Sequence, residues 1–548
     1  MADTDEITYL GIARSPYYGE SSLRDPFSGK WENVPYLHAW MLFAPLAKMA
    51  RLLGLPLILT SILWRIVGGA ILGGVLFFLF RRLFTNTQHP IAWALGCSLI
   101  CLADAGFASG RTMVGNVSLV SHIWHGTTPY LKADALPQYR VVTPILNLPF
   151  LLLVVASLLT NNLRKWKNIL LGAGALGICC LLYFYFWTAA VLALGLYGIW
   201  LLAEAWKNDF SGKGRTEWLK AQVVGLVVLG GLMIGAPQII SNSQAFANTN
   251  YKPILERIGR PCTLPPDSPA RQRYLSNLWV LGKLAIGAVG ILAFGLVGLR
   301  LLWCFTLAGY ALANSAFVTG LEFENFHWSY VHASMGEILV LATLVQLFEL
   351  WPRMRNKRWL QVPAWGLTSV LVLTALIWRA YETTHAPEAV RHRRVMQDLT
   401  PLKPSLMTIS DEHTLVLPAE AGVAVLFSQG AQLYQQYTWN SFITDNVLHE
   451  RHALNGWLLG LDLETYRQSA AADVITYCQN PERQAASVTE MRVSIFNQLL
   501  AQPNTRLLEQ YRPNYLLLPT TAPEPQRGGP WRLIQKSPTW SFWAKTAD

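Results

Sequence analysis

The chain has 548 residues, of which 52% are hydrophobic and 14% are charged, whereas an average soluble domain has about a quarter of its residues charged. Long apolar runs with almost no charge occupy residues 56–381, and residues 382–548 have the composition of an ordinary soluble protein. Because a membrane crossing needs about 20 apolar residues, these runs exclude a wholly soluble chain and predict a polytopic membrane domain. The formal net charge of +11 is explained by the positive-inside rule, so we expect no nucleic-acid partner.

The first predicted region, residues 1–56, is an outer acidic segment with helices that lie along the membrane surface. Its opening stretch, "ADTDEITYLGIAR", places the acidic pair Asp5 and Glu6 before a short predicted helix. Such a pair can cap a helix as well as catalyse a reaction, because carboxylates are favourable at helix N-termini. The spacing alone therefore leaves both interpretations open.

A second helix is expected over residues 36–56, "YLHAWMLFAPLAKMARLLGLP". Apolar side chains recur there at helical spacing, but His38, Lys48 and Arg51 would be costly at membrane depth. We therefore interpret this segment as an amphipathic helix in the outer interface and not as a crossing.

The predicted membrane domain, residues 57–381, contains about ten apolar spans. Two apolar runs, 168–205 and 278–320, are nearly twice the length of one crossing, so each is predicted to form two helices. We expect the turns near the sequence "YFYFW" in the first run and at Arg300 in the second. The spans lie at about 57–80, 89–106, 144–160, 168–186, 187–205, 221–241, 278–299, 302–319, 333–350 and 364–380.

Basic residues gather in alternate turns between these spans. Short loops rich in Lys and Arg face the cytoplasm, so both termini and the longer loops 107–143, 242–277 and 320–332 are predicted on the outer side. We therefore expect a protein of the bacterial inner (plasma) membrane whose soluble domain is periplasmic or extracellular. The basic residues are Arg81, Arg82, Arg164, Lys165, Lys167, Lys207, Lys213, Arg215, Lys220, Arg353, Arg355, Lys357 and Arg358.

The last region, residues 382–548, is predicted to be a small soluble α/β domain. Strands are expected at "HTLVLPAE" and "AVLFSQ", and helices at "NVLHERHALNGWLLGLDLETYRQSA" and "VTEMRVSIFNQLLAQ". "LEQYRPNYLLLPT" predicts a helix end followed by a strand, and "WRLIQKSPTWSFWAKT" predicts a terminal hairpin that turns at residues 536–538. The segment has no Gly-rich phosphate loop and no nucleophile elbow, so we expect a lid or a recognition module.

Candidate site residues lie in the predicted outer loops. The loop 242–277 is basic against the positive-inside trend, which suits either an anionic ligand such as phosphate or lipid headgroups. The loop around "GLEFENFHWSYVHASM" interleaves acidic and histidine side chains with aromatic ones, which indicates either an interfacial aromatic belt or a platform for a sugar or acceptor. His122 and His125 have no evident third ligand and the seven cysteines show no metal-binding spacing, so no metal site is predicted.

The arrangement of many crossings, an outer soluble domain and the acidic pair in "DEITYLGIAR" resembles the GT-C superfamily of membrane glycosyltransferases, such as protein O-mannosyltransferases and lipid A aminoarabinose transferases. Members carry an acidic motif in the first outer loop, commonly an Asp-Glu pair followed by a short helix. "DPFSGKWENVPYLHAWM" and "QYRVVTPILNLPF" also resemble outer-loop segments of that superfamily. The resemblance covers most of the chain and implies a GT-C-like helical fold.

The resemblance implies transfer of a sugar from a polyprenyl-phosphate donor to a hydroxyl or amine of a glycan, lipid or protein acceptor among the membrane lipids. It makes Asp5 the base that deprotonates the acceptor and Glu6 its assistant. It implies no nucleotide and no certain cofactor, and it leaves a divalent cation open. The expected contacts to the donor phosphate are Arg140, Lys252, Arg257 and Arg260, and those that position the acceptor or sugar are His38, Glu324, His327 and Trp328.

GT-C enzymes usually have a crossing before the acidic loop, and no such span precedes Asp5 here. We therefore expect the acidic pair to need a tether and predict an upstream segment of about 20 apolar residues. One alternative function is a ligase for lipid-linked glycans, and another is a scaffold that displays residues 382–548. A transporter is disfavoured because, apart from Asp104, few ionisable residues are found deep in the predicted crossings.

Overall fold

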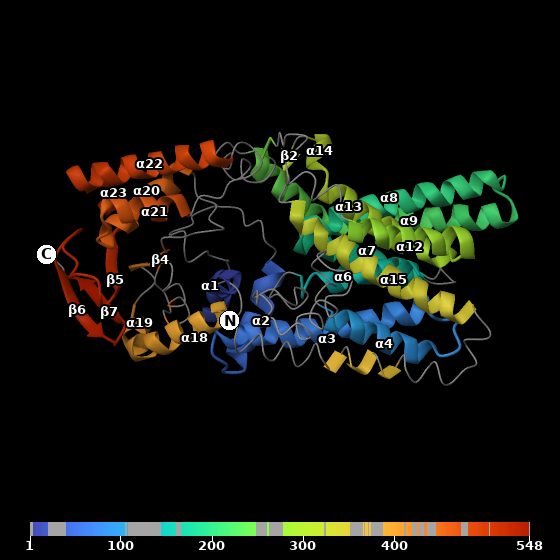
Figure 1. The fold of residues 1–548 in the computed structure, drawn as a ribbon, viewed down its shortest axis with the longest axis horizontal. Coiled ribbons are helices and arrows are strands. Elements are labelled where there is room, and N and C mark those ends of the chain that lie inside the picture. The colour runs from blue at the N-terminus through green and yellow to red at the C-terminus, as the bar shows by residue number, and fades with distance from the viewer. Residues whose placement is uncertain are drawn as a thin grey trace.

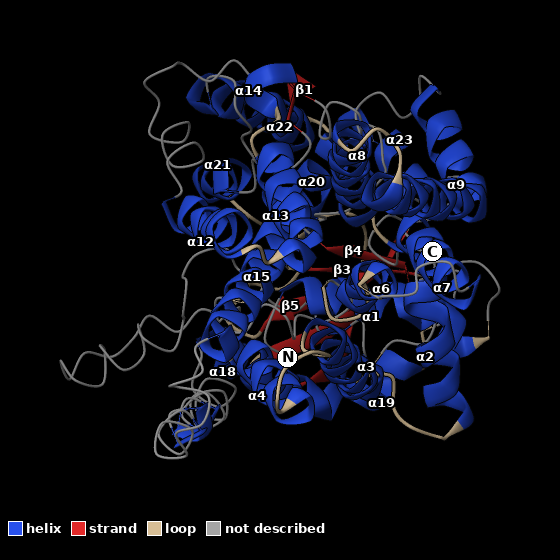
Figure 2. Cartoon of the chain, turned by 90° about the vertical axis from the view of Figure 1, so that its right-hand side faces the viewer, coloured by secondary structure: helices blue, strands red, loops and turns tan. Residues whose placement is uncertain are grey.

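The computed structural model shows an elongated molecule with a bundle of long helices at one end and a mixed unit of helices and strands at the other (Figure 1). Seen from the bundle end, the strands lie behind the helices (Figure 2). The structure describes residues 4–19, 40–104, 107, 144–159, 166–247, 260–261, 278–319, 321–322, 325–350, 365–366, 368–370, 372–373, 387–409, 413–418, 424, 427, 432–435, 445–472, 481–503 and 505–546.

Two short helices, α1 (Thr4–Tyr18) and α2 (Trp40–Leu52), precede the bundle. A helix is therefore present over 13 of the residues 36–56, as α2, whereas its place at the membrane surface stays a prediction. One face of α2 is buried through Phe43, Ala47 and Ala50, whereas Leu52, just after the basic Arg51, is 86% exposed. Helix α2 thus has one buried face and an exposed apolar residue at its C-terminal end.

The described part of the bundle consists of α3 (Leu59–Leu83), α4 (Pro90–Ala103), α6 (Leu148–Leu158), α7 (Trp166–Leu182), α8 (Phe184–Lys207), α9 (Gly212–Ala247), α12 (Leu278–Phe294), α13 (Arg300–Ala313) and α15 (Ser329–Leu350). Shorter elements accompany them: β1 (Arg260–Pro261), η3 (Val297–Leu299), α14 (Ala316–Thr319), β2 (Leu321–Glu322) and η4 (Asn325–Trp328).

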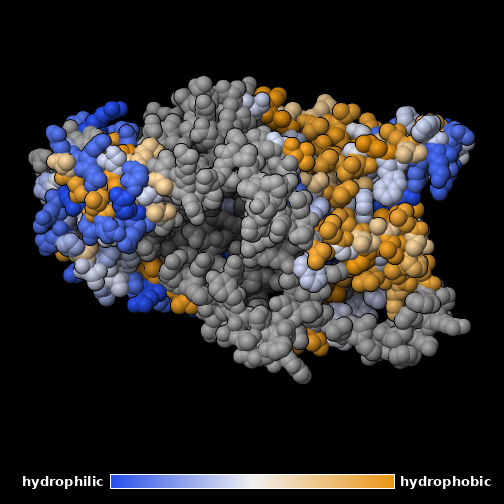
Figure 3. Space-filling model, turned by 45° about the horizontal axis from the view of Figure 1, so that its top comes forward, coloured by the Kyte–Doolittle hydropathy of each residue, from blue (hydrophilic) through white to orange (hydrophobic). Residues whose placement is uncertain are grey.

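Four helices among the described residues are long and apolar enough to cross a membrane, namely α3, α8, the Gly212–Ile240 part of α9, and α15. Shorter apolar helices are α4, α6, α7, α12 and the segment Val297–Ala313. Apolar residues cover much of the described bundle surface in Figure 3, and hydrophilic residues cover much of the C-terminal unit. The helical membrane character is therefore present, whereas the count of about ten crossings stays a prediction because the span 364–380 lies largely outside the described residues.

Both double-length apolar runs are divided where the sequence predicts. Helix α7 ends at Leu182 and α8 begins at Phe184, so the break falls on Tyr183, the first residue of "YFYFW". Helix α12 ends at Phe294, and α13 begins at Arg300. The Arg300 guanidinium forms an ion pair of 2.6 Å with Glu204 near the end of α8, which joins two helix ends that were both predicted to be cytoplasmic.

Contacts between other helix ends group the basic turns at one end of the bundle, called the basic end below. Arg82, at the end of α3, donates to the Ala156 carbonyl at 2.5 Å and to Asn168 Oδ1 at 3.1 Å. Glu349, at the end of α15, accepts a hydrogen bond of 2.8 Å from Trp93 Nε1. Trp93 lies in the first turn of α4, just after the turn that follows α3. The turn between α8 and α9 lies farthest from the C-terminal unit in Figure 1. This grouping supports the predicted alternation of loops, although which side of the membrane each end faces stays a prediction.

Helices α7 and α9 pack closely along a seam of small residues. A Cβ at Gly231 would lie 2.6 Å from Leu176, and one at Gly235 would lie 2.3 Å from Cys180. The contacts advance together along both helices, so α7 and α9 run parallel, and α8, which connects them in the chain, runs in the opposite direction. Small residues allow helix backbones to approach closely in membranes, where lipid tails provide no hydrophobic drive for association.

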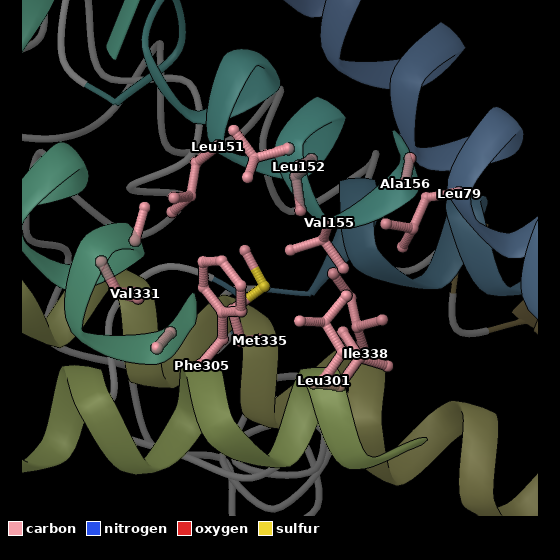
Figure 4. Packing of buried hydrophobic residues seen from close by; sticks show 14 of the residues in the cluster. Leu79, Leu151, Leu152, Val155, Ala156, Leu301, Phe305, Val331, Met335 and Ile338 are labelled. Carbon is pink, nitrogen blue, oxygen red and sulfur yellow. The ribbon is translucent and has the colours of Figure 1, made fainter. Parts of the chain in front are cut away.

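The centre of the bundle contains an apolar core. Side chains from α3, α6, α13 and α15 point toward one another there in Figure 4. They belong to the largest buried cluster and include Leu79, Leu151, Leu152, Val155, Ala156, Leu301, Phe305, Val331, Met335 and Ile338.

The C-terminal unit is built on a five-stranded sheet of order β4-β3-β5-β7-β6, parallel between β3 and both its neighbours and antiparallel elsewhere. Alternation along β3 sends Leu415 and Leu417 to one face and Val416 to the other, and each face has its own apolar core. Its strands are β3 (Thr414–Leu417), β4 (Gln432–Gln435), β5 (Pro513–Pro519), β6 (Trp531–Lys536) and β7 (Trp540–Lys545). Its helices are α18 (Pro387–Leu399), η5 (Thr400–Leu402), α19 (Lys403–Met407), α20 (Asp445–Leu458), α21 (Leu463–Ala472), α22 (Pro481–Ala501) and α23 (Thr505–Tyr511).

The predicted α/β pattern is present with two corrections. The second strand, β4, begins at Gln432, so the strand expected over residues 424–429 is wrong at the residues described there. The long helix expected over 446–470 is divided into α20 and α21, because Gly460 takes a φ of 78° that a helix does not allow. The terminal hairpin is as predicted, and Ser537 in its turn donates its backbone N–H to the Trp540 carbonyl at 2.7 Å.

Candidate functional site

Helix α1 is held by an apolar cluster, called the α1 cluster below. Tyr9 meets the ring of Phe43 on α2 at 5.8 Å, and Phe43 meets Trp64 on α3 edge-on at 6.2 Å. The Tyr17 hydroxyl also donates to the Leu55 carbonyl at 2.7 Å. The cluster consists of Leu10, Ile12, Ala13, Phe43, Ala47, Trp64 and Leu182, and Leu182 brings in the end of α7. The expected lack of a tether is therefore wrong, because the apolar face of α1 supplies one.

The acidic pair lies in the first turn of α1 and not before it, since Asp5 and Glu6 are the second and third residues of the helix. This position suits carboxylates by the helix dipole alone, so capping and chemistry both remain compatible with it. Their side chains lie outside the described residues. What the structure adds is the fixed backbone of α1 beneath them.

The predicted site residue His327 lies in η4, at the start of α15, and meets the junction of α7 and α8. The Tyr183 hydroxyl oxygen lies 2.5 Å from His327 Nδ1, and the Tyr185 ring stacks on the imidazole at 4.6 Å. Tyr183 also packs against the α1 cluster. Tyr183 therefore borders both the cluster that holds α1 and the candidate positioning histidine of η4.

Trp328 follows His327 and is only 3% exposed. Its indole N–H donates to Thr188 Oγ1 at 3.0 Å, and its ring meets Tyr185 edge-on at 5.1 Å. In this conformation Trp328 presents no ring face to a ligand. Its contacts anchor η4 on α8, and so they fix the backbone that carries His327.

Two predicted outer loops meet in a small two-stranded sheet. Strand β1 pairs antiparallel with β2, and Arg260 is the register partner of Glu322. This pairing places the backbone of Arg260 beside a segment that ends five residues before His327. The basic loop 242–277 and the loop 320–332 therefore converge at the end of the bundle that carries η4.

The remaining predicted residues are not placed. His38, Arg140, Lys252, Arg257 and Glu324 lie outside the described residues. No three His, Cys, Asp or Glu side chains gather in a way that could hold a metal ion within the described part of the chain.

The bundle also contains buried charges that the sequence analysis overlooked. Lys283 on α12 is 2% exposed, Glu337 on α15 is 4% exposed, and both interact electrostatically with Asp104 at the end of α4. His332, 4% exposed, lies on the same helix as Glu337 and is electrostatically coupled to Lys283. The expectation of few deep ionisable residues is therefore wrong. Lys283 and Glu337 each interrupt an apolar run, a signal that was visible in the sequence, so the argument against a transporter loses that observation.

The candidate site can thus be described as the end of the bundle nearest the C-terminal unit, which carries three segments: α1 with its acidic pair, the Tyr183–His327 contact, and the β1–β2 pair that contains Arg260 (Figure 1). This combination offers a carboxylate for proton transfer, a histidine for hydrogen bonding and a guanidinium for an anion. Tyr183 and Tyr185 are the residues that sequence reasoning missed, because "YFYFW" indicated only a turn.

Comparison with known proteins gives similarity in structure and not in sequence. No protein-family model and no curated protein matches the chain. The structure of ArnT from Cupriavidus metallidurans bound to undecaprenyl phosphate is similar at 14% identity and a TM-score of 0.44, over 99% of this chain and 94% of that chain. ArnT in the apo state gives 14% identity, a TM-score of 0.43 and coverage of 98% and 93%.

A third similar structure is the archaeal oligosaccharyltransferase AglB from Archaeoglobus fulgidus in complex with an inhibitory peptide and a dolichol-phosphate. It shows 12% identity and a TM-score of 0.41, over 94% of this chain and 65% of that chain. ArnT, a lipid A aminoarabinose transferase, and AglB are both members of the GT-C superfamily, which is the superfamily that the sequence resembles. These TM-scores are below 0.5, so the likeness to these structures carries no argument for the function of this chain.

Proposed function

We propose that the chain is an integral-membrane glycosyltransferase that moves a sugar from a polyprenyl-phosphate donor to an acceptor hydroxyl or amine. The observation that supports the proposal is that α1, η4 and the β1–β2 pair all lie at the same end of an apolar bundle. A donor with a polyprenyl tail is confined to the membrane, so its phosphate and sugar must be met where a bundle end reaches the lipid surface. We assign this role to the end of the bundle that carries the three segments.

The chemistry follows from the groups that these segments carry. Asp5 takes the proton of the acceptor hydroxyl, with Glu6 assisting, and the acceptor oxygen forms a bond to the anomeric carbon of the sugar. The bond between that carbon and the phosphate oxygen breaks, and the polyprenyl phosphate leaves with the electron pair. Cationic side chains stabilise the departing anion, with Arg260 from β1 supported by Arg140, Lys252 and Arg257.

The acceptor and sugar are positioned by the segment that contains η4. His327 is fixed by Tyr183 and by the stacked ring of Tyr185, so it is pre-organised for hydrogen bonding. Trp328 contributes by anchoring η4. We assign His38 and Glu324 to the same task from their positions in the neighbouring predicted loops.

The experiment that tests this proposal is a transfer assay with a panel of undecaprenyl-phosphate-linked sugars and the full chain in nanodiscs. Asp5→Asn is expected to lower transfer by about 10²- to 10⁴-fold, the usual loss when a general base is removed. Asp3→Asn, the same change in the same acidic stretch, is the matched control and should retain activity. Equal activity of the Asp5→Asn variant and the wild type would leave helix capping as the role of this carboxylate.

Donor binding is tested separately with undecaprenyl phosphate as the probe. Arg260→Ala is expected to weaken binding by roughly 10-fold or more, because hydrogen bonds to a charged group contribute about 1.5–3 kcal/mol. Arg271→Ala removes the same charge from the same loop and controls for the overall charge of that loop. Unchanged affinity in the Arg260→Ala variant would remove this residue from the proposed phosphate site.

We further propose that the end carrying α1 and the C-terminal unit face the periplasm or cell exterior, and that the basic end faces the cytoplasm. Reporter fusions after residues 265 and 420 should report the outside, and fusions after 212 and 356 should report the cytoplasm. A cytoplasmic signal at residue 420 would contradict this orientation.

A further inference from the structure

Tyr183 occupies a special position in the bundle, because it is the single residue between α7 and α8. Its backbone is extended, with a φ of −158° and a ψ of 115°, so the residue belongs to neither helix. Its ring lies 4.9 Å from Phe186 and 5.2 Å from Tyr185, which holds the ring in one place. The residue therefore acts as a fixed corner between two long helices.

Tyr183 borders the α1 cluster, in which α1 is held. Its neighbour Leu182 is a member of the α1 cluster, and Tyr183 packs against the same cluster. Leu10 and Ala13, from α1, are fully buried there. The position of α1 therefore depends in part on the apolar surface of the corner formed by Leu182 and Tyr183.

The hydroxyl of Tyr183 contacts a different segment, η4, through His327. It is hydrogen-bonded to His327 Nδ1 at 2.5 Å, while Tyr185 covers one face of the same imidazole. A neutral imidazole has one donor nitrogen and one acceptor nitrogen. When the hydroxyl donates to Nδ1, the ring proton resides on Nε2, so the bond fixes both the orientation of the ring and its tautomer.

We propose that Tyr183 is a positioning residue that holds the acidic segment α1 and His327 in one constellation, its ring fixing α1 and its hydroxyl fixing His327. The inference rests on the proposed function, in which Asp5 accepts the proton and His327 orients the acceptor. It goes further by assigning a shared support to two groups that belong to distant parts of the chain. A displacement of about 1 Å matters for such groups, since a base must lie within hydrogen-bond reach of its proton.

The two halves of the proposal are tested without any sugar donor, on the full chain in nanodiscs. The state of His327 is read from ¹⁵N-histidine NMR, with His327→Gln to assign the signal. The seat of α1 is read from tryptic cleavage after Arg14, which is 7% exposed in the structure. Tyr197→Phe is the matched control, because it removes a tyrosine hydroxyl from α8, the helix that follows Tyr183, at a position near the basic end.

Tyr183→Phe keeps the ring, so it is expected to change the His327 signal and leave Arg14 protected from trypsin. Tyr183→Leu and Tyr183→Ala remove the ring and should in addition make cleavage after Arg14 at least several-fold faster. An unchanged His327 signal in Tyr183→Phe, or full protection of Arg14 in both ring-deleting variants, would overturn the proposal.

A transfer assay then separates this inference from the proposed function. Tyr183→Phe should lower kcat by about 10- to 100-fold, as expected for a partner that orients a functional histidine, and should have no further effect in a His327→Gln background. If the wild type transfers sugar and Tyr183→Phe transfers it equally well, the positioning role fails while the proposed function stands. If the wild type transfers no sugar but both donor-free readouts respond as expected, the proposed function fails while the shared support of α1 and His327 stands.

Discussion

Replacement of Lys283 by Met probes the buried charges of the bundle. The Lys283 ammonium donates to the Ala333 carbonyl at 3.3 Å, and its side chain crosses α15 at Gly336, where an added Cβ would lie 2.8 Å from Lys283 Cδ. Glu337 lies one turn beyond Ala333 and interacts electrostatically with Lys283. Met fills a similar volume without the charge, so it leaves the carboxyl groups of Glu337 and Asp104 without their buried cation.

The expected cost is large because breaking a buried charge group by removing one partner typically costs about 3–5 kcal/mol. Each kcal/mol shifts the unfolding midpoint of a domain of some 200 residues by about 2–4 °C, so Lys283→Met should lower the midpoint by on the order of 10 °C. Thermal unfolding in detergent measures this shift. Lys220→Met is the control, because Lys220 pairs with Glu217 at 2.9 Å with its side chain 35% exposed, and such pairs contribute about 0–1 kcal/mol.

A double-mutant cycle with Glu337→Gln decides whether the two charges are coupled. Loss of Lys283 should cost less in the Glu337→Gln background, by about 1 kcal/mol or more. Two effects that add within about 0.5 kcal/mol would show that Glu337 is not the partner of Lys283, and a wild-type midpoint for Lys283→Met would refute the reasoning as a whole.

Two further predictions concern the seam between α7 and α9 and the C-terminal unit. Gly235→Ala should destabilise the bundle by about 1–3 kcal/mol in thermal unfolding, because its Cβ would lie 2.3 Å from Cys180, whereas Gly225→Ala on the same helix meets nothing within 4 Å and should be neutral or stabilising. Burial, together with the nearby Arg492 and His452, lowers the pKa of His449 from 6.5 to about 4. Between pH 6.5 and 4 the folded state then binds fewer protons than the unfolded state. The free energy of unfolding of the C-terminal unit should therefore fall by up to about 3 kcal/mol as the pH falls through this range. His449→Gln should flatten that loss in denaturant titrations at each pH, and an equally steep loss in the variant would assign it to other groups.

Local patterns in the sequence were sufficient for the elements whose causes are local. Charge and length divided the run 168–205 near Tyr183 and the run 278–320 at Arg300, and both divisions are present. The terminal hairpin was readable because its strands alternate around a short polar turn. The division of the C-terminal helix at Gly460 and the true start of β4 at Gln432 were missed, since turn geometry and strand pairing depend on neighbours that a local pattern does not contain.

The sequence by itself determined which residues are apolar enough for a membrane, where the soluble unit begins, and which loops carry acidic, basic and histidine side chains. It also named His327 and Arg260 as candidates, but from different loops and without a relation between them. Only the tertiary structure joined Arg260 to Glu322 through a strand pair and His327 to α1 through Tyr183. Only packing revealed that Lys283 on α12 and Glu337 on α15 are both buried and interact electrostatically. The physical reason is that periodicity and charge are properties of neighbouring residues, whereas a site is made by contacts between segments far apart in the chain, whose register is set by the close packing of the whole bundle.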